Sequence, residues 1–149
     1  MATRIRTCSE AISLSRELED ESARVYEELA TRWPEAEELF SSFAAENRKY
    51  VKQIERAYYG VITDALEGGF AFDLDPQEYR VDPRPSAESG FADVLREALA
   101  MEQKSLGFYE IAAEQSKHLM ADVPRTFTLV AKKRRERIAR LETLLEQAS

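Results

Sequence analysis

The sequence predicts an all-α fold, a four-helix bundle made of two helical hairpins joined by a long crossover. Three observations lead to this prediction. Only five glycines and five prolines occur among the 149 residues, and long stretches contain neither, which favours helices. Apolar residues recur at steps of three and four in four segments, so each segment has one face suited to a core. Two short breaks in this pattern flank one long break, and we expect a single domain over residues 1–149.

The first hairpin is predicted to contain helices at about residues 8–32 and 35–59. Thr7 and Glu10 have the spacing of a capping box, which marks a helix start. Trp33-Pro34 ends the first helix, because the residue before proline avoids helical geometry. In the second helix Asn47 is the strongly polar member of an otherwise apolar stripe.

Residues 60–89 are predicted to form the crossover, because they are rich in proline, glycine and aspartate. Two antiparallel neighbours need only a few linking residues, whereas two parallel neighbours need a connection about as long as a helix. A helix of 24 residues is roughly 36 Å long, and about thirty residues can span that length. We also expect one short helical turn within this segment.

The second hairpin is predicted to contain helices at about residues 90–117 and 123–147. Asp122 is suited to the cap of the last helix and Pro124 to its first turn. The inward stripe of this helix is interrupted by Arg134, and Arg137 borders it. We therefore expect both arginines to point inward, while their neighbours Lys132, Lys133 and Arg135 face solvent.

The first and third helices repeat one skeleton: a Glu, a Ser three residues later, a Tyr seven residues later and an Ala eleven residues later. These spacings place all four residues on one helical face, which is otherwise apolar. A carboxylate on such a face needs a partner. The repeated residues are Glu19, Ser22, Tyr26 and Ala30 in the first copy, and Glu102, Ser105, Tyr109 and Ala113 in the second.

The second and fourth helices also correspond, at an offset of 87 residues. The apolar positions match, but two polar positions differ between the copies. The duplication therefore covers both hairpins, with a polar centre shared between them. The matched pairs are Phe40 with Phe127, Ala44 with Ala131, Asn47 with Arg134, Tyr50 with Arg137, and Val51 with Ile138.

The chain resembles the rubrerythrin family of ferritin-like proteins. The resemblance covers roughly residues 10–59 and 90–148 and is clearest in the stretch ELEDESARVYEELA at residues 17–30. It implies a bundle holding two irons, with one Glu from each of two helices and a Glu-x-x-His pair from each of the other two. By motif position, Glu19 and Glu102 match the lone Glu ligands. Tyr26 and Tyr109 match the nearby tyrosines, and Ser22 and Ser105 lie beside them.

The chain departs from this pattern at both Glu-x-x-His pairs. Asn47 and Tyr50 occupy one pair, and Arg134 and Arg137 occupy the other. Arginine is a permanent cation that repels a metal ion, and asparagine is a weak neutral ligand. We therefore expect no metal and treat these positions as vestigial; any residual metal would bind Glu19 and Glu102.

Two further readings of the centre follow from the same residues. A one-residue shift in register would bring Glu46 or Glu136 inward, but it would turn an apolar residue outward in each helix. Charge counting favours replacement of the metals, because two carboxylates and two guanidiniums already balance. A guanidinium also binds carboxylates through a bidentate fork.

Composition limits the other roles. The net charge of −7 argues against a nucleic-acid or anionic-membrane binder. No apolar run approaches the roughly 18 residues that span a bilayer, and the start lacks a signal-peptide core, so we expect a cytoplasmic protein. Cys8 is expected to be a small residue near a helix start, and His118 a polar residue near a helix end. The sequence has no Cys-x-x-Cys pair for a rubredoxin-type iron module.

Three functions remain open from the sequence. The first is a non-catalytic ferritin-like bundle with a binding or structural role and an unidentified protein partner. The alternative is a di-iron oxidoreductase, peroxidase or ferroxidase of rubrerythrin type, which would use iron. A third is a partner-binding or nucleic-acid module using the basic run at residues 132–137, which the net charge opposes. We expect a homodimer, since such bundles often pair about a two-fold axis.

Overall fold

The computed structural model describes residues 4–63, 71–80, 90–118 and 122–148, with only the backbone at 60–63. Most of the predicted crossover, at 64–70 and 81–89, therefore lies outside the described residues. The described part contains four long α-helices, as predicted. They are α1 (Cys8–Arg32), α2 (Glu37–Thr63), α3 (Phe91–Gln115) and α4 (Asp122–Ala148).

The helix ends lie close to the start and stop signals predicted from the sequence, with small differences. Thr7 caps α1 through a capping box: its hydroxyl accepts from the Glu10 amide at 3.1 Å, and the Glu10 carboxylate accepts from the Thr7 amide at 2.9 Å. After Trp33, the residues Pro34–Ala36 form a 3₁₀ turn, η1, because proline suits a first turn. The predicted start of the second helix at residue 35 is thus wrong by two residues.

Three other predicted boundaries need correction. α2 continues to Thr63, four residues beyond the predicted end at residue 59, so Gly60 does not end the helix. α3 ends at Gln115, two residues before the predicted end, and His118 is exposed in the turn that follows. Asp122 is the first residue of α4 and does not precede it.

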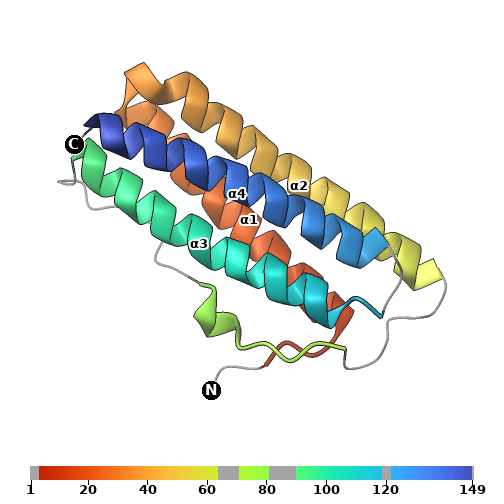
Figure 1. Cartoon of the computed structure of the whole chain (residues 1–149). Coiled ribbons are helices and arrows are strands. Elements are labelled where there is room, and N and C mark those ends of the chain that lie inside the picture. The colour runs from red at the N-terminus through yellow and green to blue at the C-terminus, as the bar shows by residue number, and fades with distance from the viewer. Residues whose placement is uncertain (1–3, 64–70, 81–89, 119–121, 149) are drawn as a thin grey trace.

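The helices form two antiparallel hairpins, α1 with α2 and α3 with α4, and α2 also packs on α4 (Figure 1). Contact between α1 and α3 is much sparser. Phe91 at the start of α3 lies 5.5 Å from the ring of Trp33 and 6.3 Å from that of Phe40. The starts of α2 and α3 are therefore at the same end, and the two helices run in the same direction.

The core is divided into two apolar clusters by a layer of polar side chains. Residues from all four helices meet in each cluster, one near each end of the bundle. One cluster includes Ile12, Ile54, Phe108, Val123 and Phe127, and the other includes Tyr26, Leu29, Phe40, Phe43, Leu95 and Leu141.

Residues 71–80 lie beside α1 and α3 over one half of the bundle (Figure 1). Ile5 and Leu74 form an isolated antiparallel bridge, with amide-to-carbonyl distances of 2.7 and 3.0 Å. Phe72 and Leu74 are buried in the nearby core cluster. Pro76–Glu78 form a second 3₁₀ turn, η2, where the sequence predicts a short helical turn.

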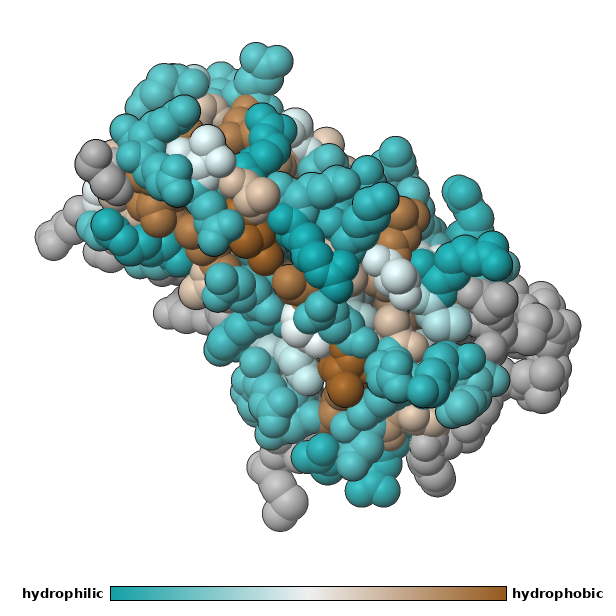
Figure 2. Space-filling view, viewed as in Figure 1, coloured by the Kyte–Doolittle hydropathy of each residue, from teal (hydrophilic) through white to brown (hydrophobic). Residues whose placement is uncertain are grey.

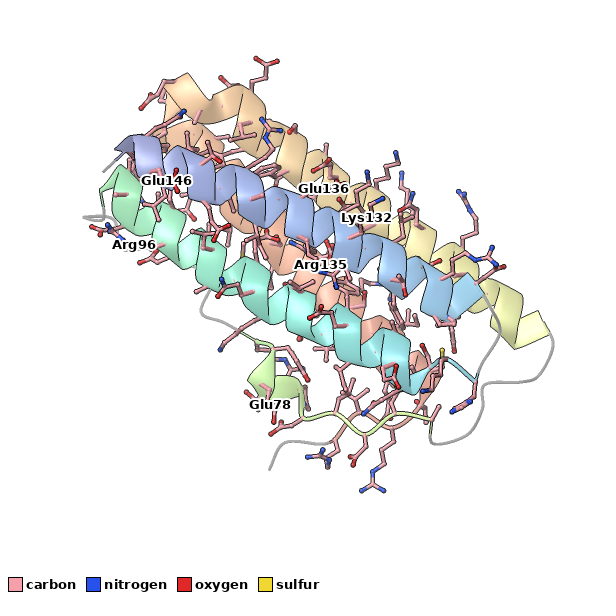
Figure 3. All side chains as sticks on the ribbon, in the orientation of Figure 1. Glu78, Arg96, Lys132, Arg135, Glu136 and Glu146 are labelled. Atoms are coloured by element: carbon pink, nitrogen blue, oxygen red, sulfur yellow. The ribbon has the colours of Figure 1, made fainter. Side chains whose placement is uncertain are left out.

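The surface seen in Figure 2 is largely hydrophilic, with scattered apolar residues. On α4, Lys132, Lys133 and Arg135 are exposed, as predicted; Figure 3 labels two of them beside Glu136. Among the described residues, no helix combines the length and the apolar character needed to cross a membrane.

Candidate functional site: a buried polar layer

The polar layer lies across the middle of the bundle and takes residues from every helix. It consists of two carboxylates, two guanidiniums, one amide and two phenols, and all of them are buried. Each is placed by the inward stripe of its own helix. The members are Glu19 and Tyr26 from α1, Asn47 from α2, Glu102 and Tyr109 from α3, and Arg134 and Arg137 from α4.

Arg134 joins the two carboxylates. Its Nη2 donates to Glu19 Oε2 at 2.5 Å, and its Nη1 donates to Glu102 Oε1 at 2.6 Å. Nη1 also lies 3.4 Å from the hydroxyl of Ser22. One fully buried guanidinium therefore connects α4 to both α1 and α3 through charge-assisted hydrogen bonds.

Arg137 connects α4 to α2 and completes the charge balance. Its Nη1 donates to Asn47 Oδ1 at 3.1 Å and to Glu102 Oε2 at 3.3 Å. Its Nη2 donates to the Phe43 carbonyl at 3.1 Å and to Glu46 Oε1 at 3.0 Å. The guanidinium carbon also lies 4.5 Å from the centre of the Phe43 ring, within cation–π range.

The two tyrosines donate reciprocally between the repeated helices. Tyr26 of α1 donates to Glu102 Oε2 of α3 at 2.5 Å, and Tyr109 of α3 donates to Glu19 Oε2 of α1 at 2.6 Å. The Tyr109 hydroxyl also shares a 2.9 Å hydrogen bond with Ser15. The repeated skeleton thus gives an approximately symmetric pair of phenol–carboxylate contacts.

Asn47 spans the layer with both ends of its amide. Its Nδ2 donates to Glu19 Oε1 at 2.6 Å, while its Oδ1 accepts from Arg137. Every carboxylate oxygen of Glu19 and Glu102 therefore accepts at least one hydrogen bond from a protein side chain. Among the described residues, the buried side-chain N and O atoms that lack a partner are the Nε atoms of the two arginines.

The ionised forms of the four charged residues balance one another. Burial by itself would raise the pKa of Glu102, but the guanidiniums of Arg134 and Arg137 and the hydrogen bond from Tyr26 outweigh it, so its pKa lies below the usual value. Burial would likewise lower the pKa of Arg134, but Glu102 and Glu19 raise it well above its usual value. The pKa shifts therefore favour a charged Glu102 carboxylate and a charged Arg134 guanidinium away from solvent.

These donors do not fit a di-iron centre. A permanent cation, Arg134, lies within hydrogen-bonding distance of both carboxylates and would repel a metal ion there. Within the described ranges, no group of three or more His, Cys, Asp or Glu side chains is placed to hold a metal ion. The chemistry that this arrangement supplies is ion pairing and hydrogen bonding.

No protein-family model, no curated protein and no solved structure matches this chain. The polar layer is therefore interpreted from its own geometry.

The structure brings together most of the residues that the sequence singled out. Two of them differ from the rest: Tyr50 is buried, but only its ring approaches the layer, 5.9 Å from the Arg137 guanidinium. Ser105 is buried but takes no hydrogen-bond partner for its hydroxyl among the described residues. The structure places Glu19, Tyr26, Asn47, Glu102, Tyr109, Arg134 and Arg137 in the layer, and Ser22 lies beside it at Arg134.

Sequence reasoning missed three contributors. Ser15 lies four residues before Glu19, on the same helical face, and this spacing could have identified it. Glu46 was considered only as an inward residue of a shifted register; its side chain is 48% exposed and reaches Arg137 from the edge. The backbone carbonyl and ring of Phe43 gave no signal, because a main-chain acceptor cannot be recognised from residue type.

The buried phenols predict a loss of stability in alkali. Burial, followed by the adjoining carboxylates, raises the pKa values of Tyr26 and Tyr109 well above 10. Because the folded state holds the phenol proton more tightly than the unfolded state does, the two phenols stabilise the fold fully below the unfolded-state pKa near 10. This stabilisation is lost as the pH rises above that pKa. Each tyrosine should then remove about 1.4 kcal/mol of unfolding free energy per pH unit.

Denaturant melts at pH 8 and 11 would measure this loss. The double variant Tyr26→Phe/Tyr109→Phe should have a lower stability at pH 8 but a smaller further loss at pH 11. Tyr59→Phe, which changes an exposed ring, serves as the control. An equal loss in the wild type and the double variant would contradict the prediction.

Proposed function

We propose that this protein is a ferritin-like bundle of rubrerythrin type in which a buried ionic layer takes the place of the di-iron centre. In this proposal the protein has a binding or structural role and carries out no redox chemistry. The observation that carries it is the Arg134 bridge between Glu19 and Glu102. These are the two positions that match the lone Glu ligands.

The directions of the helices and the duplicated hairpins support the same proposal. α2 and α3 start at the same end of the bundle, so the connection between them returns along its length, as in ferritin-like folds. The reciprocal tyrosines support descent of both hairpins from one unit. A homodimer, an unidentified protein partner and a cytoplasmic location belong to the same proposal.

The polar layer has a physical role that needs no metal. A hydrogen-bonded group of buried charges penalises any slip of one helix past another, because a slip would leave ions without partners. We propose that the layer fixes the register of the four helices in this way. The outer surfaces are then free to provide binding.

An iron titration tests the proposal. Protein purified without a histidine tag should hold well below one iron per chain after aerobic loading with ferrous salt, and it should show no oxo-bridged iron absorption. The reason is that a permanent cation already occupies the carboxylates. Stoichiometric uptake of two irons per chain would overturn the proposal and support a di-iron oxidoreductase instead.

A further inference from the structure

A groove lies between α1 and α3, where these helices make few contacts. Its volume is about 750 Å³, within the range of small-molecule sites. One wall is α1 and the other is α3, and Tyr79 and Arg80 from the connecting segment border it. The described lining residues include Leu18, Val25 and Glu28 from α1 and Met101 and Ser105 from α3.

The floor of the groove is apolar with one polar group. Leu18, Val25 and Met101 are buried apolar side chains that line it. Ser105 also lines it, is 2% exposed, and has no side-chain partner among the described residues. Its counterpart in the repeat, Ser22, lies 3.4 Å from Arg134. Among the described residues, the buried side-chain polar atoms without a partner are the Nε atoms of Arg134 and Arg137; the Ser105 hydroxyl instead opens onto the groove, where a ligand can bond to it.

The rim carries three carboxylates and two guanidiniums. Arg80 pairs with Glu17 at 2.6 Å, and Arg24 pairs with Glu21 at 2.7 Å. No ion pair involves Glu28 in the part of the chain that the structure describes. Among the described lining residues, the rim therefore has one carboxylate more than guanidiniums, and Glu28 is the carboxylate outside an ion pair.

Glu28 and Ser105 lie toward opposite ends of the groove. Glu19 and Glu102 are at the same level, since both bind Arg134. Glu28 lies nine residues after Glu19 on α1, and Ser105 lies three residues after Glu102 on α3. Because α1 and α3 are antiparallel, these steps lead in opposite directions along the bundle. Twelve residues correspond to roughly 18 Å along the bundle.

We propose that this groove binds an extended aliphatic amine that carries a neutral hydrogen-bonding group at its far end. The ammonium pairs with Glu28, the chain lies on Leu18, Val25 and Met101, and the far group bonds to the Ser105 hydroxyl. This inference gives a ligand class to the binding role proposed above and rests on that role. The iron titration tests a different claim, that the polar layer holds no metal. The groove proposal and the metal-free layer can therefore fail independently.

Isothermal titration calorimetry tests the proposal with a linear amino alcohol, dodecanol that carries an amine at the end opposite the hydroxyl. We expect one ligand per chain, with affinity about fivefold weaker in Glu28→Gln, the effect of an exposed ion pair. Ser105→Ala should also weaken binding about fivefold by removing one hydrogen bond. Glu38→Gln, an exposed change on α2, is the matched charge control and should bind as the wild type does.

Two further ligands complete the experiment. Dodecylamine, which lacks the hydroxyl, should bind the wild type more weakly than the amino alcohol does. The two ligands should bind Ser105→Ala equally well. Dodecanoate with a terminal hydroxyl should not bind, because its head group is an anion. No binding of the amine, equal binding of the anion, or an unchanged affinity in Glu28→Gln would overturn the proposal. If amine binding decreases as the protein self-associates, the groove binds a second copy of the chain. That result would overturn the proposal as well.

Discussion

Replacing Arg134 with methionine is expected to lower the free energy of unfolding by about 3–5 kcal/mol, the usual result of removing one partner from a buried ion pair. Methionine keeps the unbranched aliphatic stem of arginine but is shorter and lacks the guanidinium. Glu19 and Glu102 would lose their shared cation while remaining fully buried. Equilibrium denaturant melts would measure the loss, with the exposed Arg135→Met as control.

The two carboxylates should respond differently to this change. Glu102 keeps a second guanidinium, Arg137, at 3.3 Å, whereas Glu19 keeps only neutral donors from Asn47 and Tyr109. In the Arg134→Met background, Glu19→Gln should therefore recover more stability than Glu102→Gln, because a neutral amide is less costly to bury than an unpaired anion. Additive effects across this cycle would show that the three side chains are not coupled.

The sequence was sufficient to predict the main features of the layer. The repeated skeleton placed Glu19 and Glu102 on core-facing stripes, and the offset between the second and fourth helices placed Arg134 opposite them. Helical spacing fixes which face a residue occupies, so inward charges could be recognised as mutual partners. The four helices followed from the same periodicity.

Other features depend on distances between helices. The spacing of residues along one helix does not predict these distances. Ser22 and Ser105 occupy equivalent places in the repeat, yet only Ser22 is near a guanidinium. The difference arises because the position equivalent to Arg134 is Asn47, whose short side chain bonds Glu19 instead. The groove beside Ser105 likewise follows from the separation of α1 and α3. Helix ends such as Thr63 were missed because a single glycine does not stop a helix.

Introducing the rubrerythrin-type donor set, which the proposed function says this layer replaced, is expected to convert the layer into an iron site. The quadruple variant Asn47→Glu/Tyr50→His/Arg134→Glu/Arg137→His places a Glu-x-x-His pair on α2 and another on α4. Positions 47 and 134 both contact Glu19 in the wild type, so glutamates there lie within reach of it. Four carboxylates would then balance the charges of two ferrous ions. Aerobic titration should give two irons per chain and oxo-bridged absorption.

The retained cation provides the decisive control for this variant. Asn47→Glu/Tyr50→His/Arg137→His keeps Arg134 between Glu19 and Glu102 and should bind far less iron. Without metal, four buried carboxylates repel one another, so the quadruple variant should be strongly destabilised and should regain stability with ferrous ion. Refolding in the presence of iron, followed by circular dichroism, separates failure to fold from failure to bind. A folded quadruple variant without bound iron would mean that these positions do not form a di-iron site, which would contradict the proposed ancestry of the layer.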